Sequence, residues 1–236
     1  MNNKLNILHL YYDLMNLYGE SGNIKAIEYY LTQQNIKTNI IQKSINDDID
    51  LSHIDLIYIG CATETNQLIG LNHLKQYKEE LKDYIENNKF IIATGNSFEL
   101  FGKIIHNNNK EVKGLNIFDY QTIKTEKRIV NEGIFKTNLI KENIIGFQNH
   151  NNKIETNNPI LLPLKTKGTP IKCDGYNYKN FYGTYTIGPI LVRNPKLLTY
   201  LLNKLIKQKY KDKKIKKVDL KLDELAYQEF INNYYK

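Results

Sequence analysis

The residues best placed for chemistry lie where an apolar run ends in a small polar turn, within Ile91–Gly102 (IIATGNSFELFG). Phe90–Ala93 predicts a buried strand, Thr94–Ser97 a tight turn, and the segment from Phe98 onward a helix. In α/β proteins such a turn opens the crevice where ligands bind, beside a helix N-terminus with free N–H groups. A nucleophile there becomes an exposed elbow. This elbow holds Gly95, so on shape alone the simpler interpretation is a βα turn with glycine at positive φ.

Other residues that could supply a nucleophile or a base are few. The chain has two cysteines, Cys61 and Cys173, which excludes a disulfide scaffold or a CxxC metal site and indicates a reducing compartment. We expect no metal site and no cofactor. The five histidines are His9, His53, His73, His106 and His150. None follows position 150, so no histidine can act from the last third of the chain.

Composition excludes several classes of protein. The net charge is +8, but it comes almost entirely from lysine, and the densest basic run, 204–217, is typical of a solvated helix end and loop. Nucleic acid binding through this run stays a remote alternative, because the sequence has no aromatic-glycine motif of the RNA-binding kind. No apolar run reaches the roughly 18 residues of a membrane span. The N-terminus lacks the pattern of a signal peptide, so we expect a cytoplasmic soluble protein.

The elements that must position the elbow alternate along the first hundred residues. Short apolar runs at 5–10, 38–41, 54–59 and 90–93 predict strands, and residues 24–34 and 67–87 have the apolar spacing of helices. This alternation predicts an α/β fold with a mostly parallel central sheet and helices on both faces. Shorter β-type runs after Gly102 predict an antiparallel extension of the same sheet. Helices are expected at 196–208 and 220–235, without a linker that would separate domains.

Several further motifs occur in a consistent order. They are LHLYYDLMNLYGESGNI (8–24), IYIGCATETNQ (57–67), TGNSFELFG (94–102), GLNIFDYQT (114–122), KRIVNEG (127–133), GFQNH (146–150) and YKNFYGTYTIGPILVRNP (178–195). Together they resemble the class I glutamine amidotransferases of the CobB/CobQ-like, cobyric-acid-synthase type. Within that group they are most similar to GatD, the amidotransferase subunit of lipid II isoglutaminyl synthase. The resemblance covers about residues 5–205.

The resemblance implies a flavodoxin-like amidotransferase fold over residues 1–236 as a single domain, with a C-terminal helical tail at 206–236. It implies glutamine hydrolysis, in which a cysteine thiolate at the elbow attacks the side-chain amide and a histidine transfers protons. Backbone N–H groups form the oxyanion hole. The ammonia then passes to a partner, which for GatD is a Mur-ligase-like synthetase that amidates a cell-wall precursor.

Both catalytic positions of that family differ in this chain. Without gaps, FELFG aligns with the family's YQLLG, which places Gly95 on the nucleophilic cysteine. GTYTIGP aligns with GTYLHGP, which places Ile187 on the catalytic histidine. Neither side chain can act as a nucleophile or exchange a proton, and loss of one such group typically lowers the rate by orders of magnitude.

Cys61 is the one residue that could replace the nucleophile. It falls on a family glycine in the neighbouring βα turn, although a small buried hydrophobe is the simpler interpretation. Its thiol would need a base, and the nearest candidates in the sequence, Glu64 and His73, have no matching role in the family. Ser97 is expected to cap a helix or to contact a phosphate or carboxylate.

The binding positions are better preserved than the catalytic ones. Arg128 falls on the arginine that the family uses near the glutamine site, and could bind a carboxylate bidentately or form a surface salt bridge. Asn96 and Ser97 fall on two family glycines and offer amide and hydroxyl contacts. Glu99 replaces a family Gln and Glu64 a family Asp, which changes the charge of the pocket. His150 follows a strand, where a structural hydrogen bond is the simpler role.

Two functional hypotheses follow from these residues. In the first, the chain is a non-catalytic amidotransferase homologue that binds a ligand, glutamine or a related amide or carboxylate, or serves as the subunit of a Mur-ligase-like protein. In the second, it is a glutaminase or amide hydrolase whose displaced nucleophile is Cys61. The two differ in whether the thiol of Cys61 can be activated.

Overall fold

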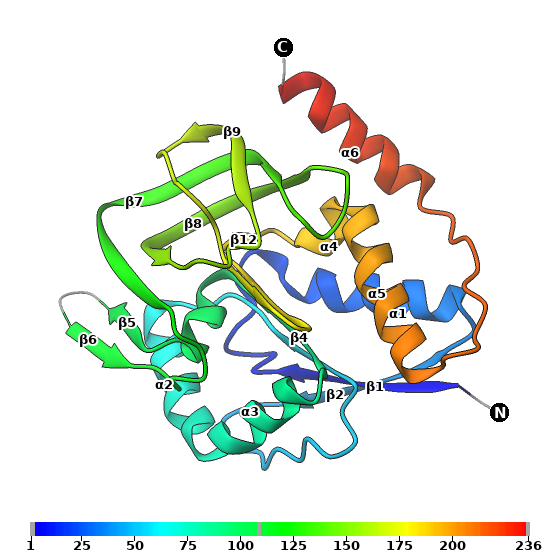
Figure 1. Ribbon diagram of the computed structural model, residues 1–236, viewed down its shortest axis with the longest axis horizontal. Coiled ribbons are helices and arrows are strands. Elements are labelled where there is room, and N and C mark those ends of the chain that lie inside the picture. Colours follow the sequence, from blue (N-terminus) through cyan, green and yellow to red (C-terminus); the bar gives the residue numbers. More distant parts are fainter. Residues whose placement is uncertain (1–2, 108–109, 235–236) are drawn as a thin grey trace.

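The computed structural model describes residues 3–107 and 110–234, and a six-stranded, mostly parallel sheet lies at its centre (Figure 1). The strand order is β10–β11–β4–β3–β1–β2, and only β10 runs antiparallel to its neighbour. The strands are β1 (Lys4–Leu10), β2 (Lys37–Lys43), β3 (Leu56–Ile59), β4 (Phe90–Thr94), β10 (Tyr176–Tyr178) and β11 (Phe181–Thr184). This doubly wound order confirms the predicted α/β class.

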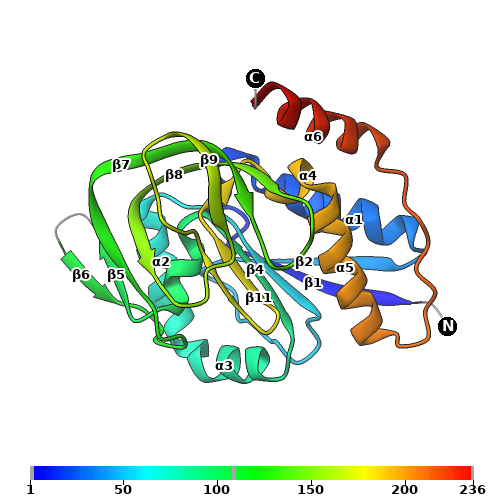
Figure 2. The same cartoon turned by 45° about the horizontal axis from the view of Figure 1, so that its top comes forward.

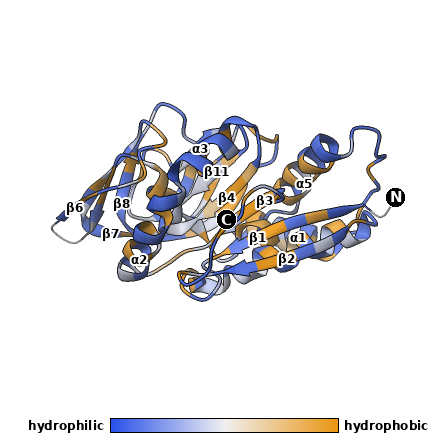
Figure 3. Ribbon diagram, turned by 90° about the horizontal axis from the view of Figure 1, so that it is seen from below, coloured by the Kyte–Doolittle hydropathy of each residue, from blue (hydrophilic) through white to orange (hydrophobic). Residues whose placement is uncertain are grey.

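Helices cover both faces of this sheet because its inner strands are apolar on both sides (Figure 3). Ile57 and Ile59 of β3 pack with α2 and α3, whereas Leu56 and Tyr58 pack with α1 and α5. The helices are α1 (Ser21–Gln33), α2 (Glu64–Leu74), α3 (Lys78–Glu86), α4 (Ile190–Arg193), α5 (Pro195–Lys209) and α6 (Lys221–Tyr234). None of the described helices is both long and apolar enough to cross a membrane.

Most of the antiparallel strands form a second sheet instead of extending the first. Its order is β12–β8–β7–β9, and a separate hairpin pairs β5 with β6. The strands are β5 (Ile104–Asn107), β6 (Lys110–Lys113), β7 (Gln121–Lys136), β8 (Ile144–Glu155), β9 (Leu162–Gly168) and β12 (Thr186–Ile187). The long strands β7 and β8 curve away from the central sheet, and α6 packs against β8, α4 and α5 (Figure 2).

The helix expected over residues 67–87 is divided in two. A 3-10 turn, Lys75–Tyr77, separates α2 from α3, and Tyr77 leaves helical geometry (φ −99°, ψ 11°). The Tyr77 hydroxyl accepts a hydrogen bond from the backbone N–H of Ile49, and its ring meets that of His73 edge-on. The break therefore lets both halves pack on the sheet while Tyr77 ties the preceding loop to it.

The helix expected after the elbow is also shorter than the sequence predicts. Gly95–Phe101 is a 3-10 helix, and the next strand begins at Ile104. The carbonyls of Leu100 and Phe101 accept hydrogen bonds from backbone N–H groups of residues 115, 117 and 118 instead of continuing a helix. Phe98, Leu100 and Phe101 are fully buried, so the apolar residues that resemble one face of a helix pack in several directions.

Candidate functional site

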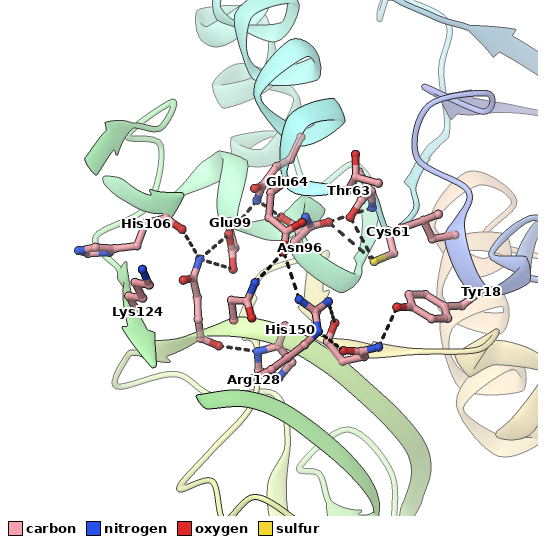
Figure 4. Close-up of a pocket in the computed structure, with 16 residues that line it drawn as sticks. Tyr18, Cys61, Thr63, Glu64, Asn96, Glu99, His106, Lys124, Arg128 and His150 are labelled. Atoms are coloured by element: carbon pink, nitrogen blue, oxygen red, sulfur yellow. Dashed lines mark hydrogen bonds and ion pairs between the residues drawn. The ribbon is translucent and has the colours of Figure 1, made fainter. Parts of the chain in front are cut away.

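A cavity of about 230 Å³ lies where the turns after β3 and β4 face the antiparallel strands β7 and β8 (Figure 4). The loop before α1 contributes Leu17 and Tyr18 to its wall. Cys61 and Tyr18 lie at one end and His106 and Lys124 at the other, with Glu99 between them. Its volume is below the 300–1,000 Å³ typical of sites for drug-sized ligands, so it fits a small metabolite.

The elbow has a glycine at positive φ and no room for a side chain. Gly95 has φ +64°, a conformation that L side chains rarely adopt. A Cβ added there would lie 2.4 Å from both Cβ and Sγ of Cys61 and 2.9 Å from its Cα. The side chain of Cys61 therefore occupies the space that a residue at the elbow would need, and the two turns pack as a glycine–cysteine pair.

The thiol of Cys61 is buried, and its surroundings favour the protonated form. Burial, followed by the negative charges of Glu20, Glu99 and Glu64, raises the pKa of Cys61 to about 12. The polar neighbours of Sγ are the Ala62 carbonyl and the Asn96 side-chain oxygen, each 3.8 Å away. Neither can take a proton at neutral pH, so the thiol has the properties of a buried structural cysteine.

Asn96 and Ser97 hold the two turns together. The Asn96 side-chain oxygen accepts a hydrogen bond from the backbone N–H of Ala62 (2.9 Å), which occupies a donor that could otherwise stabilise an oxyanion. Ser97 is fully buried, and its hydroxyl lies 2.8 Å from the Thr94 carbonyl and 3.0 Å from that of Ile59. Asn96 lines the cavity, whereas the hydroxyl of Ser97 binds the backbone of β3 and β4.

Glu99 is the buried carboxyl group of the cavity. It is 1% exposed and accepts hydrogen bonds from the Tyr185 hydroxyl (2.7 Å), the Gln67 amide (2.7 Å) and the Asn152 amide (3.2 Å to each oxygen). Burial outweighs these donors and raises the pKa of Glu99 to about 7. The carboxyl group therefore titrates near neutral pH.

Arg128 and Glu64 meet across the cavity. Arg128 Nη1 lies 3.3 Å from Glu64 Oε1, and both side chains are about two-fifths exposed. Arg128 Nε also donates to the side chain of Asn149, and the amide of Asn151 donates to Glu64 at 2.8 Å. Figure 4 shows this pair linking α2 to the strands β7 and β8. Arg128 thus lies on the cavity wall in a partly exposed salt bridge, one of the two roles expected for it from the sequence.

His150 lines the same wall and is neutral. Its ring stacks on Tyr185 with centroids 3.7 Å apart and planes 1° from parallel. Nδ1 pairs with the backbone carbonyl of Asn152, which requires Nδ1 to carry the proton. Burial lowers the pKa of His150 to about 3, so Nε2 has a free lone pair at neutral pH. The structural hydrogen bond expected from the sequence is present, and the ring also faces the cavity.

The position expected to carry the catalytic histidine lies next to a second buried carboxyl group. Ile187 ends β12 and is 1% exposed, and the following residue, Gly188, donates its N–H to Glu20 (3.1 Å). Glu20 is fully buried, accepts from Tyr58 (2.8 Å), and also pairs with Thr94. Burial raises the pKa of Glu20. This network joins the loop before α1, β3, β4 and β12 beneath the elbow.

The structure brings together Cys61, Glu64, Asn96, Glu99 and Arg128 on one cavity and leaves the side chain of Ser97 in the packing beneath it. The sequence reading missed the donors of Glu99, which are Gln67, Asn152 and Tyr185. The available signal was a glutamate inside an apolar run (FELF), since a buried carboxyl group requires such donors. Its sequence position does not reveal where they come from. No cluster of three or more His, Cys, Asp or Glu side chains capable of holding a metal occurs in residues 3–107 and 110–234.

Comparison with known proteins identifies the family. The CobB/CobQ-like glutamine amidotransferase domain matches residues 6–195. The chain belongs to the CobB/CobQ-like glutamine amidotransferase family. It is 30% identical over 214 residues to the GatD subunit of the glutamine-hydrolysing lipid II isoglutaminyl synthase of Streptococcus pneumoniae (88% of this chain, 82% of that one). It is 29% identical over 210 residues to the Staphylococcus aureus GatD subunit (87% and 86%).

Among solved structures, the chain is similar to a glutamine amidotransferase from Thermotoga maritima. The TM-score is 0.49 and the sequence identity 9%, over 98% of this chain and 92% of that chain. The assignment to the family rests on the sequence comparisons, which span most of the chain. The resemblance of the motifs to those of GatD is thereby confirmed.

Proposed function

We propose that this chain is a non-catalytic member of the amidotransferase family that acts as a ligand-binding subunit of a Mur-ligase-like protein in cell-wall precursor amidation or a related pathway. The observation that carries the proposal is the packing of Cys61 against Gly95. The side chain of Cys61 fills the space where a side chain at the elbow would begin, and burial keeps its thiol protonated.

The second catalytic position supports the same proposal. Ile187 is buried at the end of β12 and has no group that can exchange a proton. The remaining cavity still offers Arg128, Asn96, Glu64 and Glu99 to a ligand. Loss of the reactive pair with retention of a polar cavity is the pattern expected of a subunit that binds a ligand without hydrolysing it.

The partner is inferred from the relatives. Both GatD relatives are named as subunits of a lipid II isoglutaminyl synthase. An amidotransferase subunit of this kind requires a synthetase subunit that receives its product or signal. We place the complex in the cytoplasm and assign residues 1–236 to a single amidotransferase-like domain with the C-terminal helical tail 206–236. Glutamine or a related small amide or carboxylate is the first ligand to test, because Arg128 lies on the cavity wall.

The alternative, an active glutaminase with Cys61 as a displaced nucleophile, is favoured by one observation. The Cβ and Sγ of Cys61 lie within 2.4 Å of the point where an elbow side chain would begin, so the thiol is near the usual place of attack. Against it, attack requires a thiolate, and the polar neighbours of Sγ are a carbonyl and an amide oxygen.

Ammonia release from glutamine by the purified protein separates the two hypotheses. We expect background rates for the wild type, for Cys61→Ala and for Arg128→Ala, both alone and with the Mur-ligase-like protein encoded nearest to it. Activity abolished by Cys61→Ala would establish the alternative. Co-purification of the untagged ligase with the tagged chain tests the partner. Failure of the pair to associate at micromolar concentration would contradict the subunit role.

A further inference from the structure

The positive charge of the protein is concentrated in one segment near the C-terminus. Residues 204–221 contain nine lysines and two aspartates, so they carry +7 of the formal net charge of +8. The rest of the chain is therefore nearly neutral. A general preference for lysine would spread the charge over the whole surface, so this segment requires a local explanation.

The middle of the segment, which we call the basic linker (residues 210–220), joins α5 to α6 and is held against the protein. The Gln34 amide donates to the Lys216 carbonyl (2.7 Å), and its oxygen accepts from the Lys216 N–H (2.9 Å). Ile215 and Leu220 pack into the core on the side of α1 and α5. The apolar side chains of the linker thus point inward, and its lysines are presented as an ordered array.

Six exposed lysines of the segment form no ion pair within residues 3–107 and 110–234. They are Lys207, Lys211, Lys214, Lys216, Lys217 and Lys221. Lys209, by contrast, pairs with Asp55 (2.7 Å). The Tyr210 hydroxyl donates to the carbonyl of Lys4 (2.6 Å), which lies beside Lys37 in the sheet, and both of these lysines are exposed too. We call these eight lysines the basic surface.

Two exposed leucines follow the linker directly. Leu222 is 81% exposed and Leu225 56%, the highest values among the large apolar side chains of the described residues. They lie one turn apart on α6, on the side opposite Tyr234, which packs on the second sheet. Tyr29, which is 48% exposed, lies beside them in the chain's fold, its hydroxyl 3.4 Å from the Asp219 carbonyl. Exposed leucines next to a lysine array indicate a partner with anionic groups and an apolar interior.

We propose that the basic surface and the start of α6 bind the surface of an anionic lipid bilayer. The lysines lie against the headgroup phosphates as point charges, and Leu222 and Leu225 enter the boundary of the acyl chains. Nucleic acid would use the lysines but not the leucines. Residues 204–221 also lack arginine, the side chain that binds phosphate bidentately.

The basic surface and the cavity lie at opposite edges of the central sheet. Lys4 and Lys37 begin β1 and β2, whereas the cavity lies beyond the ends of β3 and β4 (Figure 1). A bilayer bound at the basic linker therefore leaves the cavity open to its ligand. The inference goes beyond the proposed function, because it concerns a different surface and does not depend on what the cavity binds.

Co-sedimentation of the whole chain with lipid vesicles tests the proposal. The probes are vesicles of phosphatidylcholine alone and vesicles with roughly one-third phosphatidylglycerol, each at about 50 and 300 mM NaCl. We expect the anionic vesicles to bind at least about 30-fold more tightly than the neutral ones at the lower salt concentration, since each lysine near the surface contributes roughly fivefold. The higher salt concentration should weaken this binding about tenfold or more. Equal binding to both vesicles, or none to either, would overturn the proposal.

A lysine variant connects the binding to the basic linker. The triple variant Lys211→Gln, Lys214→Gln and Lys217→Gln should bind the anionic vesicles roughly 100-fold more weakly. The matched control removes the same charge from exposed lysines on the 3-10 turn before α3, on α3 and on β6, which are Lys75, Lys82 and Lys113. Equal losses in both triple variants would assign the binding to net charge alone and contradict the proposal.

A leucine variant distinguishes the bilayer from nucleic acid. Leu222→Ser with Leu225→Ser should weaken binding to the anionic vesicles about tenfold and leave binding to duplex DNA unchanged. Leu162→Ser with Leu164→Ser, at exposed positions of β9, is the matched control and should change neither. The proposal is wrong if the variant at 222 and 225 keeps its full affinity for the vesicles, or if the wild type binds DNA more tightly than it binds them.

Fluorescence shows whether α6 enters the bilayer. The chain contains no tryptophan, so Leu222→Trp supplies a single reporter. Its emission should move to shorter wavelength when the anionic vesicles are added, and lipids brominated in their acyl chains should quench it. Leu164→Trp, on β9, should show neither effect. Emission from Leu222→Trp that stays unchanged while the protein sediments with the vesicles would contradict the insertion of α6.

Discussion

Replacing Gly95 with alanine tests the packing of the elbow directly. The new Cβ would lie 2.4 Å from the Cβ and Sγ of Cys61, a distance that real side chains do not tolerate. Overpacking of this kind costs about 1–3 kcal/mol. The positive φ of Gly95 (+64°) adds about 1–2 kcal/mol for any L side chain. We therefore expect Gly95→Ala to lower the free energy of unfolding by roughly 2–5 kcal/mol.

The second change, Cys61→Gly, removes the side chain that causes the collision. Alone it should cost about 1–2 kcal/mol through lost burial and greater backbone freedom. In the double variant the contacts with Cβ and Sγ disappear, although the new Cβ remains 2.9 Å from the Cα of residue 61. The double variant should therefore be more stable than the sum of the two single changes by about 1–3 kcal/mol. The cost of positive φ is not recovered.

Urea unfolding followed by circular dichroism at pH 7 measures the cycle. Gly19→Ala is the matched control, because Gly19 also has a positive φ (+75°) but a Cβ added there meets nothing within 4 Å. It should show the backbone cost alone. If Gly95→Ala lowers the free energy of unfolding no more than Gly19→Ala does, Cys61 does not occupy the space of the elbow side chain. The same conclusion follows if the changes in unfolding free energy at positions 95 and 61 are additive in the double variant.

Three further results follow from buried groups. Because burial raises the pKa of Cys61 to about 12, iodoacetamide at pH 8 should label it at least about tenfold more slowly than half-buried Cys173, as followed by peptide mass spectrometry. Equal rates would contradict the protected thiol. Burial raises the folded-state pKa of Glu99 from 4.5 to about 7, so the native state holds the extra proton. As the pH rises from 4.5 to 7, the free energy of unfolding of the wild type relative to Glu99→Gln should therefore decrease, by at most roughly 1.4 kcal/mol per pH unit in urea titrations. An increase over this range would contradict the raised pKa of Glu99. Glu20→Ala removes the buried carboxyl group that accepts hydrogen bonds from Tyr58, Thr94 and the Gly188 N–H, and should cost about 3 kcal/mol or more by thermal denaturation, whereas Glu20→Gln, which keeps an acceptor, should cost less.

The parts of the fold that follow from local pattern could be predicted. Strands such as Phe90–Thr94 and Leu56–Ile59 are buried on both faces, and continuous apolar runs of this kind are typical of strands within a parallel sheet. The element boundaries and sheet arrangement that the sequence predicted wrongly depend on contacts between residues far apart in the chain. The segment after the elbow stops being helical because backbone N–H groups within residues 115–118 donate hydrogen bonds to its carbonyls. The second sheet is separate from the first because β7 pairs with β8 and β9. These pairings join segments far apart in the chain, so the local sequence pattern does not predict them.

The candidate site divides in the same way. The sequence by itself determined the family motifs, the glycine at position 95 and the isoleucine at position 187, because these are identities at fixed positions along the chain. Only the tertiary structure decided that Cys61 lies against Gly95 and that Glu99 takes its donors from Gln67, Asn152 and Tyr185. Burial sets the pKa of each group, and burial is a property of segments packed from far apart in the chain. The sequence therefore indicates that the usual nucleophile is missing, and the packing explains why the remaining thiol stays protonated.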